Sequence, residues 1–413
     1  MDQNNFGGTY VNQPLEGIRV LELGMFHAGP GGAAILGDLG AEVIKIEQPG
    51  SGDPIRKLDF VGHVHLELEG GRSIWHEAAN RSKKSVTIDL NKEKGREIAY
   101  RLVSKSDVFL ASVRRPAVEK LKMDYVTLSS INPKIIYAWV SGYGPNGPDR
   151  DVGAFDYQGQ GRSGMMFCVG EPDMTPLVSQ FGIIDQATSI MASHEIITAL
   201  LMRERFGIGQ EVHVSILSTA LYMLYCNVLI ALVGGFEAPR HQRSTEHPLR
   251  NYYKCADGRW FILTAGIFDK YWPSLCQAIG HPELENDERF DSAEKLRVNS
   301  EQLVALFDQF FATRPRDEWL KVLAKYDLPV APVNRLCELV DDPQIIENGY
   351  IMDFDHPRLG KIKIPGYPVH FSKTDARTRI AAPELGEHTS SVLREIGSYS
   401  DKEIAQFRDE GVI

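Results

Sequence analysis

Cysteine is scarce in this sequence, and the few cysteines stand too far apart to form a recognisable site. There are five among 413 residues, and neighbouring cysteines are separated by more than twenty positions. This spacing produces no CxxC zinc motif and no paired framework of the kind that small secreted proteins use. We therefore expect free thiols in a reducing cytoplasm, and no metal site.

Basic runs and an apolar N-terminal segment are also missing. The formal net charge is -10, and the lysines and arginines are scattered among acidic residues. That balance argues against nucleic acid as the main partner and favours a small-molecule substrate. The opening residues, MDQNNFGGTYVNQPLEG, contain neither the basic nor the apolar region of a signal peptide.

One uncharged stretch, residues 214–236, has the length that a bilayer-spanning helix needs. Serine, threonine and asparagine side chains dilute it, and polar segments flank it on both sides. We interpret it as a helix buried on all sides, in the core or in a subunit interface, and expect no membrane partner.

The composition, with 43% hydrophobic and 24% charged residues, is typical of a globular protein with one large core or two moderate ones. In the first half, apolar runs alternate with helical patterns. The expected strands cover residues 18–22, 42–47, 85–90, 107–112 and 135–144, and the expected helices cover 31–39, 92–106, 119–123 and 185–205. This alternation predicts a doubly wound α/β domain with a parallel sheet.

The pattern changes after a further strand expected at 210–216. A hairpin is predicted to turn at Asp257 and Gly258, and helices are expected over 270–280, 292–312 and 316–326. These elements predict a second, smaller domain. The chain is then proline-rich and strand-like, and it closes with a helix.

A glycine motif follows the first expected strand. Residues 29–34 match G-x-G-x-x-A, and Glu47 lies at about the spacing of a ribose-binding acid, which taken alone favours an NAD-dependent dehydrogenase. However, GMFHA separates the strand from Gly29, and Pro30 lacks a backbone donor that a pyrophosphate would use. The remaining interpretations are a turn that cradles an anion, or glycines that only permit a tight turn and close helix packing.

Short motifs recur from about residue 14 to the C-terminus. They are PLEGIRVLEL, AGP, LGAEVIKIE followed by PGSGDP, NRSKKSVTIDL, SGYG, the D-x-x-x-Q of Asp156 to Gln160, and APELGEHT. Taken together and in this order, they resemble the family III CoA-transferases of the CaiB/BaiF type, which include formyl-CoA transferase and benzylsuccinate CoA-transferase.

The resemblance implies that Asp185, in the segment IIDQATS, is a catalytic nucleophile. The residues alone favour a simpler role, in which Asp185 caps the N-terminus of the helix that runs to about Arg205. Both roles are compatible, because a helix N-terminus stabilises a carboxylate and keeps it ionised for attack.

The implied reaction moves CoA from an acyl-CoA donor to a carboxylic acid through an aspartyl-CoA thioester. Its oxyanions need hydrogen-bond donors, and we assign these to His27 and to the turn containing Ala28 and Gly29. Asp156 and Gln160 are expected as further polar residues beside Asp185. Their alternative role is capping or hydrogen bonding within loops.

CoA, the only cofactor the resemblance implies, brings three phosphates that need cationic partners. The basic residues that lie next to expected strands are assigned to these contacts, with solvated surface positions as the alternative: Lys83, Lys84, Arg114, Arg115 and Lys120. The chain departs from formyl-CoA transferases nearby, because Gln48 stands where those enzymes have arginine, and Ser112-Val113-Arg114 replaces Asn-Phe-Gly.

Three other functions remain open. An α-methylacyl-CoA racemase shares the fold, but its pattern has a histidine just before an aspartate, where this chain reads Ala154-Phe155-Asp156. A non-catalytic subunit of a heteromer is disfavoured by the presence of Asp185. A dehydrogenase is the least favoured.

The resemblance also implies an interlocked dimer, either a homodimer or a heteromer with a homologous subunit. The large α/β domain is expected to use both chain ends, residues 1–220 and 335–413. A small α+β domain is expected over 240–332, with a connecting helix and linker over 221–239.

The sequence does not identify the donor and acceptor acids. Aromatic and methionine residues near the expected site hint at an apolar acid: Met25, Phe26, Phe155, Tyr157, Met165 and Met166. We expect succinyl-CoA as the donor and an aromatic or dicarboxylic acid as the acceptor.

Overall fold

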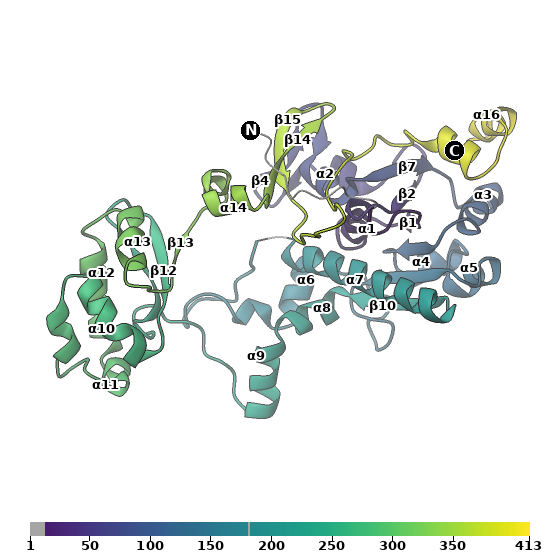
Figure 1. Ribbon diagram of the computed structural model, residues 1–413. Coiled ribbons are helices and arrows are strands. Elements are labelled where there is room, and N and C mark those ends of the chain that lie inside the picture. The colour runs from purple at the N-terminus through teal and green to yellow at the C-terminus, as the bar shows by residue number, and fades with distance from the viewer. Residues whose placement is uncertain (1–12, 181) are drawn as a thin grey trace. The chain divides into compact units, whose positions relative to one another are not determined.

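The computed structural model describes residues 13–180 and 182–413, and the chain divides into two compact units (Figure 1). The first unit contains the chain up to residue 166 together with 178–236 and 349–413. The second contains 167–177 and 237–348. Residues 335–348, predicted for the large domain, therefore lie in the second unit, and so do residues 167–177.

The first unit is built on a six-stranded sheet with the order β10-β9-β8-β1-β2-β7. All neighbouring strands are parallel. The strands are β1 (Arg19–Leu23), β2 (Glu42–Glu47), β7 (Lys83–Thr87), β8 (Val108–Ala111), β9 (Ile136–Ser141) and β10 (Gln210–Ser215). This is the doubly wound order in which β1 and β8 are neighbours at the topological switch point, so the predicted α/β class with a parallel sheet is confirmed.

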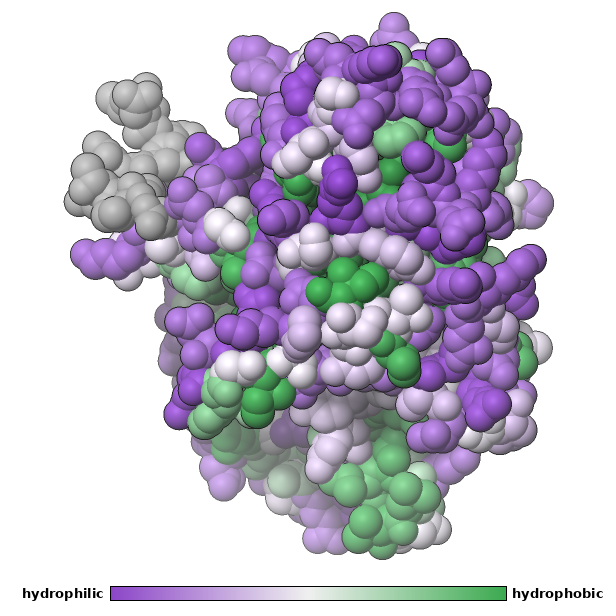
Figure 2. Space-filling model, turned by 90° about the vertical axis from the view of Figure 1, so that its right-hand side faces the viewer, coloured by the Kyte–Doolittle hydropathy of each residue, from purple (hydrophilic) through white to green (hydrophobic). Residues whose placement is uncertain are grey.

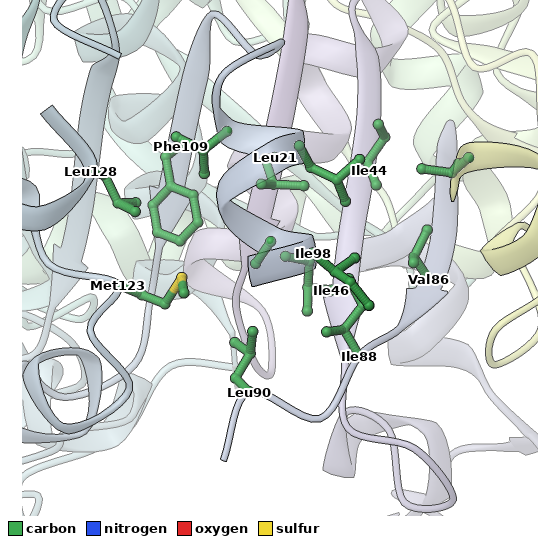
Figure 3. Close-up of a cluster of buried hydrophobic side chains, with 14 of the residues drawn as sticks. Leu21, Ile44, Ile46, Val86, Ile88, Leu90, Ile98, Phe109, Met123 and Leu128 are labelled. Carbon is green, nitrogen blue, oxygen red and sulfur yellow. The ribbon is translucent and has the colours of Figure 1, made fainter. Parts of the chain in front are cut away.

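Helices cover both faces of this sheet. Successive side chains of a strand point to opposite faces, so Val20 packs with α1 (Ala28–Asp38) and α7 (Ile183–Phe206). Leu21 packs in the opposite core, together with α3 (Glu93–Val103). Figure 3 shows part of this second core around Leu21. The other helices that contribute to this core are α4 (Arg115–Lys120), α5 (Tyr125–Ile131), α15 (Thr389–Glu395) and α16 (Asp401–Asp409).

The glycines of α1 bring this helix close to α7. A Cβ atom added to Gly31 would lie 2.3 Å from Ser189 Oγ, and one added to Gly32 would lie 2.9 Å from Ala192 Cβ. These glycines therefore serve close helix packing, which was one of the interpretations left open. The helix begins at Ala28 rather than at residue 31, so the AGP motif forms its first turn.

The remaining elements of the first unit are short. They are the hairpins β3–β4 (Phe60–Val61, Val64–His65), β5–β6 (Glu67–Leu68, Arg72–Ser73) and β14–β15 (Ile351–His356, Gly360–Pro365), and the helices α2 (Ile74–Asn80), α4 (Arg115–Lys120) and α6 (Asp156–Arg162). The C-terminal segment joins the edge strand β7, where His388 N donates to Ser85 O at 2.9 Å. Both chain ends thus build this unit.

The uncharged stretch after β10 differs from the prediction. It breaks into α8 (Ile216–Met223), α9 (Tyr225–Leu229) and a turn of π-helix to Gly234, and no residue from Tyr225 to Gly234 is buried. Leu232 and Val233 are about 80% exposed. Hydrophobic side chains gather at the lower end of the view in Figure 2, at the height of α9 in Figure 1. The prediction of one helix buried in the core is therefore wrong, whereas burial in a subunit interface stays a prediction.

Within residues 13–180 and 182–413, no single helix is long and apolar enough to cross a membrane. The pair formed by α8 and the segment Tyr225–Gly234 has the required length and composition, but the pair is bent by 78°.

The second unit has a three-stranded antiparallel sheet with the order β11-β12-β13. The strands are β11 (Arg250–Lys254), β12 (Trp260–Thr264) and β13 (Val330–Val333), and the helices are α10 (Phe268–Ala278), α11 (Ala293–Val298), α12 (Ser300–Phe311), α13 (Arg316–Ala324) and α14 (Pro343–Glu347). The predicted hairpin is present, because Cys255 N donates to Arg259 O at 2.8 Å. The core of the second unit is rich in aromatic rings around Phe311.

Candidate active site

Two adjoining pockets lie at the carboxyl edge of the six-stranded sheet, where ligands bind in doubly wound folds. The larger one, of about 810 Å³, is lined by residues that follow β1, β2, β7 and β8. The smaller one, of about 90 Å³, lies where β1, β8 and β9 end and α7 begins. The two pockets share the segments 25–26, 112–114 and 152–155 as a common wall. The edge therefore offers a large compartment and a small one side by side.

Asp185 lines the small pocket and lies in the first turn of α7. The helix begins at Ile183, and Gly182 occupies the cap position with φ of 82°. Glycine is suited to this left-handed conformation because it has no Cβ. Asp185 is thus the third residue of the helix, and the alternative in which it caps the helix is wrong.

Asp156 provides the capping carboxylate instead. Its Oδ2 accepts hydrogen bonds from Ile184 N at 2.7 Å and from Asp185 N at 3.2 Å. Its Oδ1 accepts from Gln160 Nε2 at 2.5 Å, and Gln160 Oε1 accepts from Ser179 N at 2.9 Å. The structure therefore brings Asp156 next to Asp185 in the capping role that was its alternative, whereas Gln160 makes hydrogen bonds to Asp156 and to the loop at Ser179.

The protonation of Asp185 differs from the expectation. Burial, and then the neighbouring charge of Asp156, raise the pKa of the Asp185 carboxyl to about 7. The helix N-terminus favours the ionised form, but removal from water has the larger effect. A carboxylate with this pKa is poorly solvated and partly protonated near neutral pH.

His27 lies directly before α1 and lines the same small pocket. Its Nε2 is 2.8 Å from Gln186 Oε1, so this nitrogen donates its proton to the amide oxygen in the neutral ring. Burial lowers the pKa of His27, which keeps the ring neutral. The buried Nδ1 atom, which has no hydrogen-bond partner within residues 13–180 and 182–413, is then an acceptor only.

Ala28 and Gly29 open α1 and also line the small pocket. The first backbone N–H groups of a helix have no partner within the helix, so they are available to an oxyanion. A Cβ atom at Gly29 would lie 2.3 Å from Ser112 Cβ, which explains why this position needs glycine. The first turn of α1 and Asp185 therefore line the same compartment.

Lys83 has a different environment from the one predicted. Its Nζ is fully buried and lies 2.6 Å from Glu22 Oε2 and 2.8 Å from Pro30 O. Burial lowers the pKa of Lys83 to about 7, with the positive charge of Lys45 acting in the same direction. A contact with a CoA phosphate would require this ammonium to leave its buried partners, so the assignment of Lys83 to phosphate is wrong for this structure.

The other basic residues are divided by position. Arg114 is exposed and lines both pockets. Lys84 pairs with Glu42 at 2.7 Å, Arg115 stacks over the Trp139 ring at 4.3 Å, and Lys120 is exposed on α4. These three are not among the residues that line the two pockets, so Arg114 is the predicted cation that the structure brings to the site.

Glu47, the acid of the dehydrogenase alternative, is already engaged. Its carboxylate accepts from Arg56 Nη2 at 2.6 Å, Ser85 Oγ at 2.6 Å and Asp53 N at 3.0 Å. A ribose would have to displace these donors. No group of three or more metal-ligating side chains lies together in the part of the chain that the structure describes.

Some pocket residues were not found from the sequence. Ser112 follows β8 directly, Trp139 lies within β9, and Arg150 belongs to the loop after β9. The position of Ser112 at the end of an expected strand was a usable sign, whereas Arg150 had none. Of the residues that hinted at an apolar acid, Met25, Phe26 and Phe155 line both pockets, whereas Tyr157, Met165 and Met166 line neither.

Comparison with known proteins identifies the chain. The model of CoA-transferase family III matches residues 15–389. A human relative, succinyl-CoA:glutarate CoA-transferase, is 30% identical over 100% of this chain and 91% of its own length. A Clostridioides difficile relative, (R)-2-hydroxy-4-methylpentanoate CoA-transferase, is 31% identical over 97% of this chain and 99% of its own length.

Among solved structures, a CaiB/BaiF family protein from Brucella suis is similar to this chain with a TM-score of 0.83 and 32% identity. The match covers 94% of this chain and 100% of the Brucella chain. Sequence and fold thus agree over nearly the whole length, and the chain belongs to CoA-transferase family III.

Proposed function

We propose that this CoA-transferase works through a covalent intermediate on Asp185. The observation that carries the proposal is the position of this carboxylate, which is buried in the small pocket beside the first turn of α1. A poorly solvated carboxylate is a stronger nucleophile than a hydrated one, and an acid is a suitable temporary acceptor when one acid is exchanged for another.

The reaction begins when an oxygen of the Asp185 carboxylate attacks the thioester carbon of the donor. The C–S bond breaks, and CoA thiolate leaves behind a mixed anhydride. The thiolate then attacks the carboxyl carbon of Asp185, which releases the donor acid and forms an aspartyl-CoA thioester. The acceptor carboxylate repeats both steps in reverse, so the free Asp185 carboxylate is regenerated and no net proton is transferred.

Each step places negative charge on an acyl oxygen. The backbone N–H groups of Ala28 and Gly29 are the proposed donors to this charge. His27 forms part of the wall of the small pocket, and its hydrogen bond holds Gln186, the residue that follows the nucleophile. This differs from a role in which His27 donates directly, because its one proton is directed to Gln186.

The larger pocket is the proposed site of the CoA nucleotide and pantetheine arm. Its volume of about 810 Å³ is in the range of cofactor sites, and it opens at the switch point of the sheet. Arg114 stands where this pocket meets the small one, so we assign it to a phosphate or to the carboxylate of a dicarboxylic substrate.

Succinyl-CoA and a dicarboxylic acid are the first substrates to test. Arg114 and Arg150 both line the small pocket, and a cation there would hold the distal carboxylate of a short diacid. The name of the human relative points to the same class of acids. Met25, Phe26 and Phe155 would surround the methylene groups between the two carboxylates.

We further propose an interlocked dimer, or a heteromer with a homologous subunit, in a reducing cytoplasm. The exposed apolar residues of α9 and the turn after it favour burial against a partner chain. Native mass spectrometry of the purified protein tests this point, since a homodimer predicts twice the chain mass of 46.2 kDa.

The covalent intermediate is tested by trapping. Enzyme incubated with acyl-CoA and then treated with borohydride or hydroxylamine should carry the modification on Asp185, as read in a peptide map. Asp185→Asn should lose at least about a thousandfold in kcat while still binding CoA. Glu195→Gln is the matched control, because Glu195 lies on the same helix with a pKa that burial raises to about 8, outside both pockets. An unmodified Asp185 in active enzyme would rule out the mechanism.

A further inference from the structure

The loop between β1 and α1 is held at three consecutive residues by polar groups from neighbouring elements. Gly24 O accepts a hydrogen bond from Lys45 Nζ at 3.0 Å. Met25 N donates to Ser112 Oγ at 3.2 Å, and Phe26 N donates to Asp53 Oδ1 at 3.1 Å. The next residue in the chain is His27.

The two charged members of this set are bonded to each other. Lys45 Nζ lies 2.9 Å from Asp53 Oδ2 and 2.8 Å from Glu22 Oε1, and all three side chains are fully buried. Asp53 Oδ1 also accepts from Ile55 N at 3.0 Å. Burial alone would lower the pKa of Lys45, but Asp53 and Glu22 outweigh it and raise this pKa, so the lysine stays charged. Buried ion pairs of this kind contribute little net stability and fix geometry instead.

The held loop has an unfavourable backbone conformation. Phe26 has φ of 62°, in the left-handed region that residues with a side chain rarely adopt. Gly24 is closely surrounded, since a Cβ atom there would lie 2.8 Å from Ser112 Oγ and 3.0 Å from Glu22 Oε1. Such a conformation persists only where the surroundings determine it.

We infer that Lys45 and Asp53 are positioning residues that set the place of His27 and of the first turn of α1 against Asp185. The inference rests on the proposed function, in which that turn supplies the oxyanion donors. Neither residue needs to touch the reacting atoms, because both act through the backbone of residues 24 to 26. A displacement of about 1 Å in such a site costs on the order of a hundredfold in rate.

The test compares two buried aspartates at opposite ends of α1. Asp53→Ala removes the acceptor of Phe26 N and the partner of Lys45. Asp38→Ala is the matched control, because Asp38 is equally buried and accepts from Arg81 Nε, Ser82 Oγ and Thr378 Oγ1 at 2.9 to 3.0 Å, at the C-terminal end of the helix. Both variants lose a buried carboxylate, but only the first loses the support of the loop.

We expect Asp53→Ala to lower kcat by about 30- to 100-fold, with the KM for acyl-CoA changed less than about threefold. The rate at which Asp185 is acylated in a single turnover should fall by the same factor. Asp38→Ala should lower thermal stability by a similar amount and kcat by less than about threefold. If Asp53→Ala does not fold, Asp53→Asn keeps an acceptor for Phe26 N and should lose about five- to tenfold.

Two results would overturn the inference. One is an equal loss of kcat in the Asp38 and Asp53 variants, which would mean that both act only through stability. The other is a raised KM with an unchanged kcat, which would mean that Asp53 supports CoA binding in the larger pocket that it lines. Wild-type enzyme that transfers CoA without acylating Asp185 would contradict the proposed function instead, and the kcat comparison would still decide the inference.

Discussion

The first unit buries many charged side chains, whereas the second unit buries an apolar core rich in aromatic rings. The charged residues buried in the first unit are Glu22, Asp38, Lys45, Glu47, Asp53, Lys83, Asp156 and Asp185. Among the described residues of the second unit, Arg316 is the one buried charged side chain, and the core contains Tyr253, Phe261, Trp272, Phe290, Phe307, Phe311 and Trp319.

The difference shows two uses of a protein interior. Buried aromatic rings remove large apolar areas from water and stabilise the fold with little directional demand. Buried charges contribute little or negative net stability, but their hydrogen bonds fix the positions of neighbouring groups. The first unit thus gives up stability at the place where Asp185 and the first turn of α1 must be held, and the following predictions test that comparison.

The largest effect is expected from the aromatic core. Phe311 is fully buried, and its ring centroid lies 4.8 Å from that of Phe261 and 5.2 Å from that of Trp319. Phe311→Ala should lower the free energy of unfolding by about 3–5 kcal/mol and change kcat by less than about threefold under native conditions. Phe310→Ala, at a half-buried neighbouring position, is the control. Chemical denaturation should show that it lowers the free energy of unfolding by less than about 2 kcal/mol. A loss of kcat as large as that of Asp53→Ala would break the comparison.

The next effect concerns the stability cost of the nucleophile. The pKa of Asp185 is raised to about 7, so between about pH 4 and pH 7 the folded protein keeps a proton that the unfolded chain has lost. Stability from this group therefore falls as pH rises through that window, and the cost is complete above about pH 7. Asp185→Asn should be more stable than wild type by about 2–4 kcal/mol at pH 8, and the gap should close toward pH 4. Thermal melts of both proteins between pH 4 and pH 8 measure this difference in stability. A difference that does not depend on pH would contradict the raised pKa of Asp185.

A smaller effect separates two basic residues of the first unit. Arg114 lines both pockets, whereas Lys84 pairs with Glu42 and lines neither. Arg114→Ala should raise the KM for acyl-CoA or for a diacid acceptor about tenfold, as the loss of one charge-assisted hydrogen bond does. Lys84→Ala should change either KM by less than about twofold. Equal effects of the two substitutions in steady-state kinetics would remove Arg114 from the site.

The smallest effect is a shift in the pH profile. The rate should rise with pH through about 7 as Asp185 ionises, because only the carboxylate attacks. Asp156→Asn removes a neighbouring negative charge but keeps an oxygen that caps α7, so the midpoint should move to lower pH. Burial remains as the larger cause, which limits the shift to about one unit or less. A midpoint that stays in place or rises would show that Asp156 does not act on Asp185 through its charge.

The fold was predicted in its main lines from local patterns. Alternating apolar runs and helical periods predicted the six strands of the large parallel sheet and the long helix that the structure begins at Ile183, whereas the short strands β3 to β6 were not predicted. Boundaries between short elements were harder, since α4 (Arg115–Lys120) was expected at residues 119–123 and α5 was not predicted. For the segment after β10 both the core and a subunit interface were left open, because apolar composition predicts burial without telling whether the same chain or a partner provides it.

Site residues that lie in recognisable motifs were predicted from the sequence. Features that depend on contacts between residues far apart in the sequence were not predicted. Asp185, His27, Ala28 and Gly29 were chosen from motifs, and the structure brings them to one pocket. The buried environment of Lys83 had no sequence sign, because its partner Glu22 is 61 positions away. The raised pKa of Asp185 has the same origin, since burial depends on the packing of α1 against α7 and not on the neighbours in the sequence.

The path of one oxygen atom tests the central claim, that Asp185 carries the transferred CoA. With an acceptor acid labelled with 18O in its carboxylate, the two anhydride steps move a labelled oxygen onto Asp185, and the next turnover moves it into the released donor acid. The account predicts 18O both in the peptide containing Asp185 and in the donor acid, as measured by mass spectrometry. Label in the donor acid with none in Asp185 would mean direct attack of the acceptor on the donor thioester, and would contradict the account.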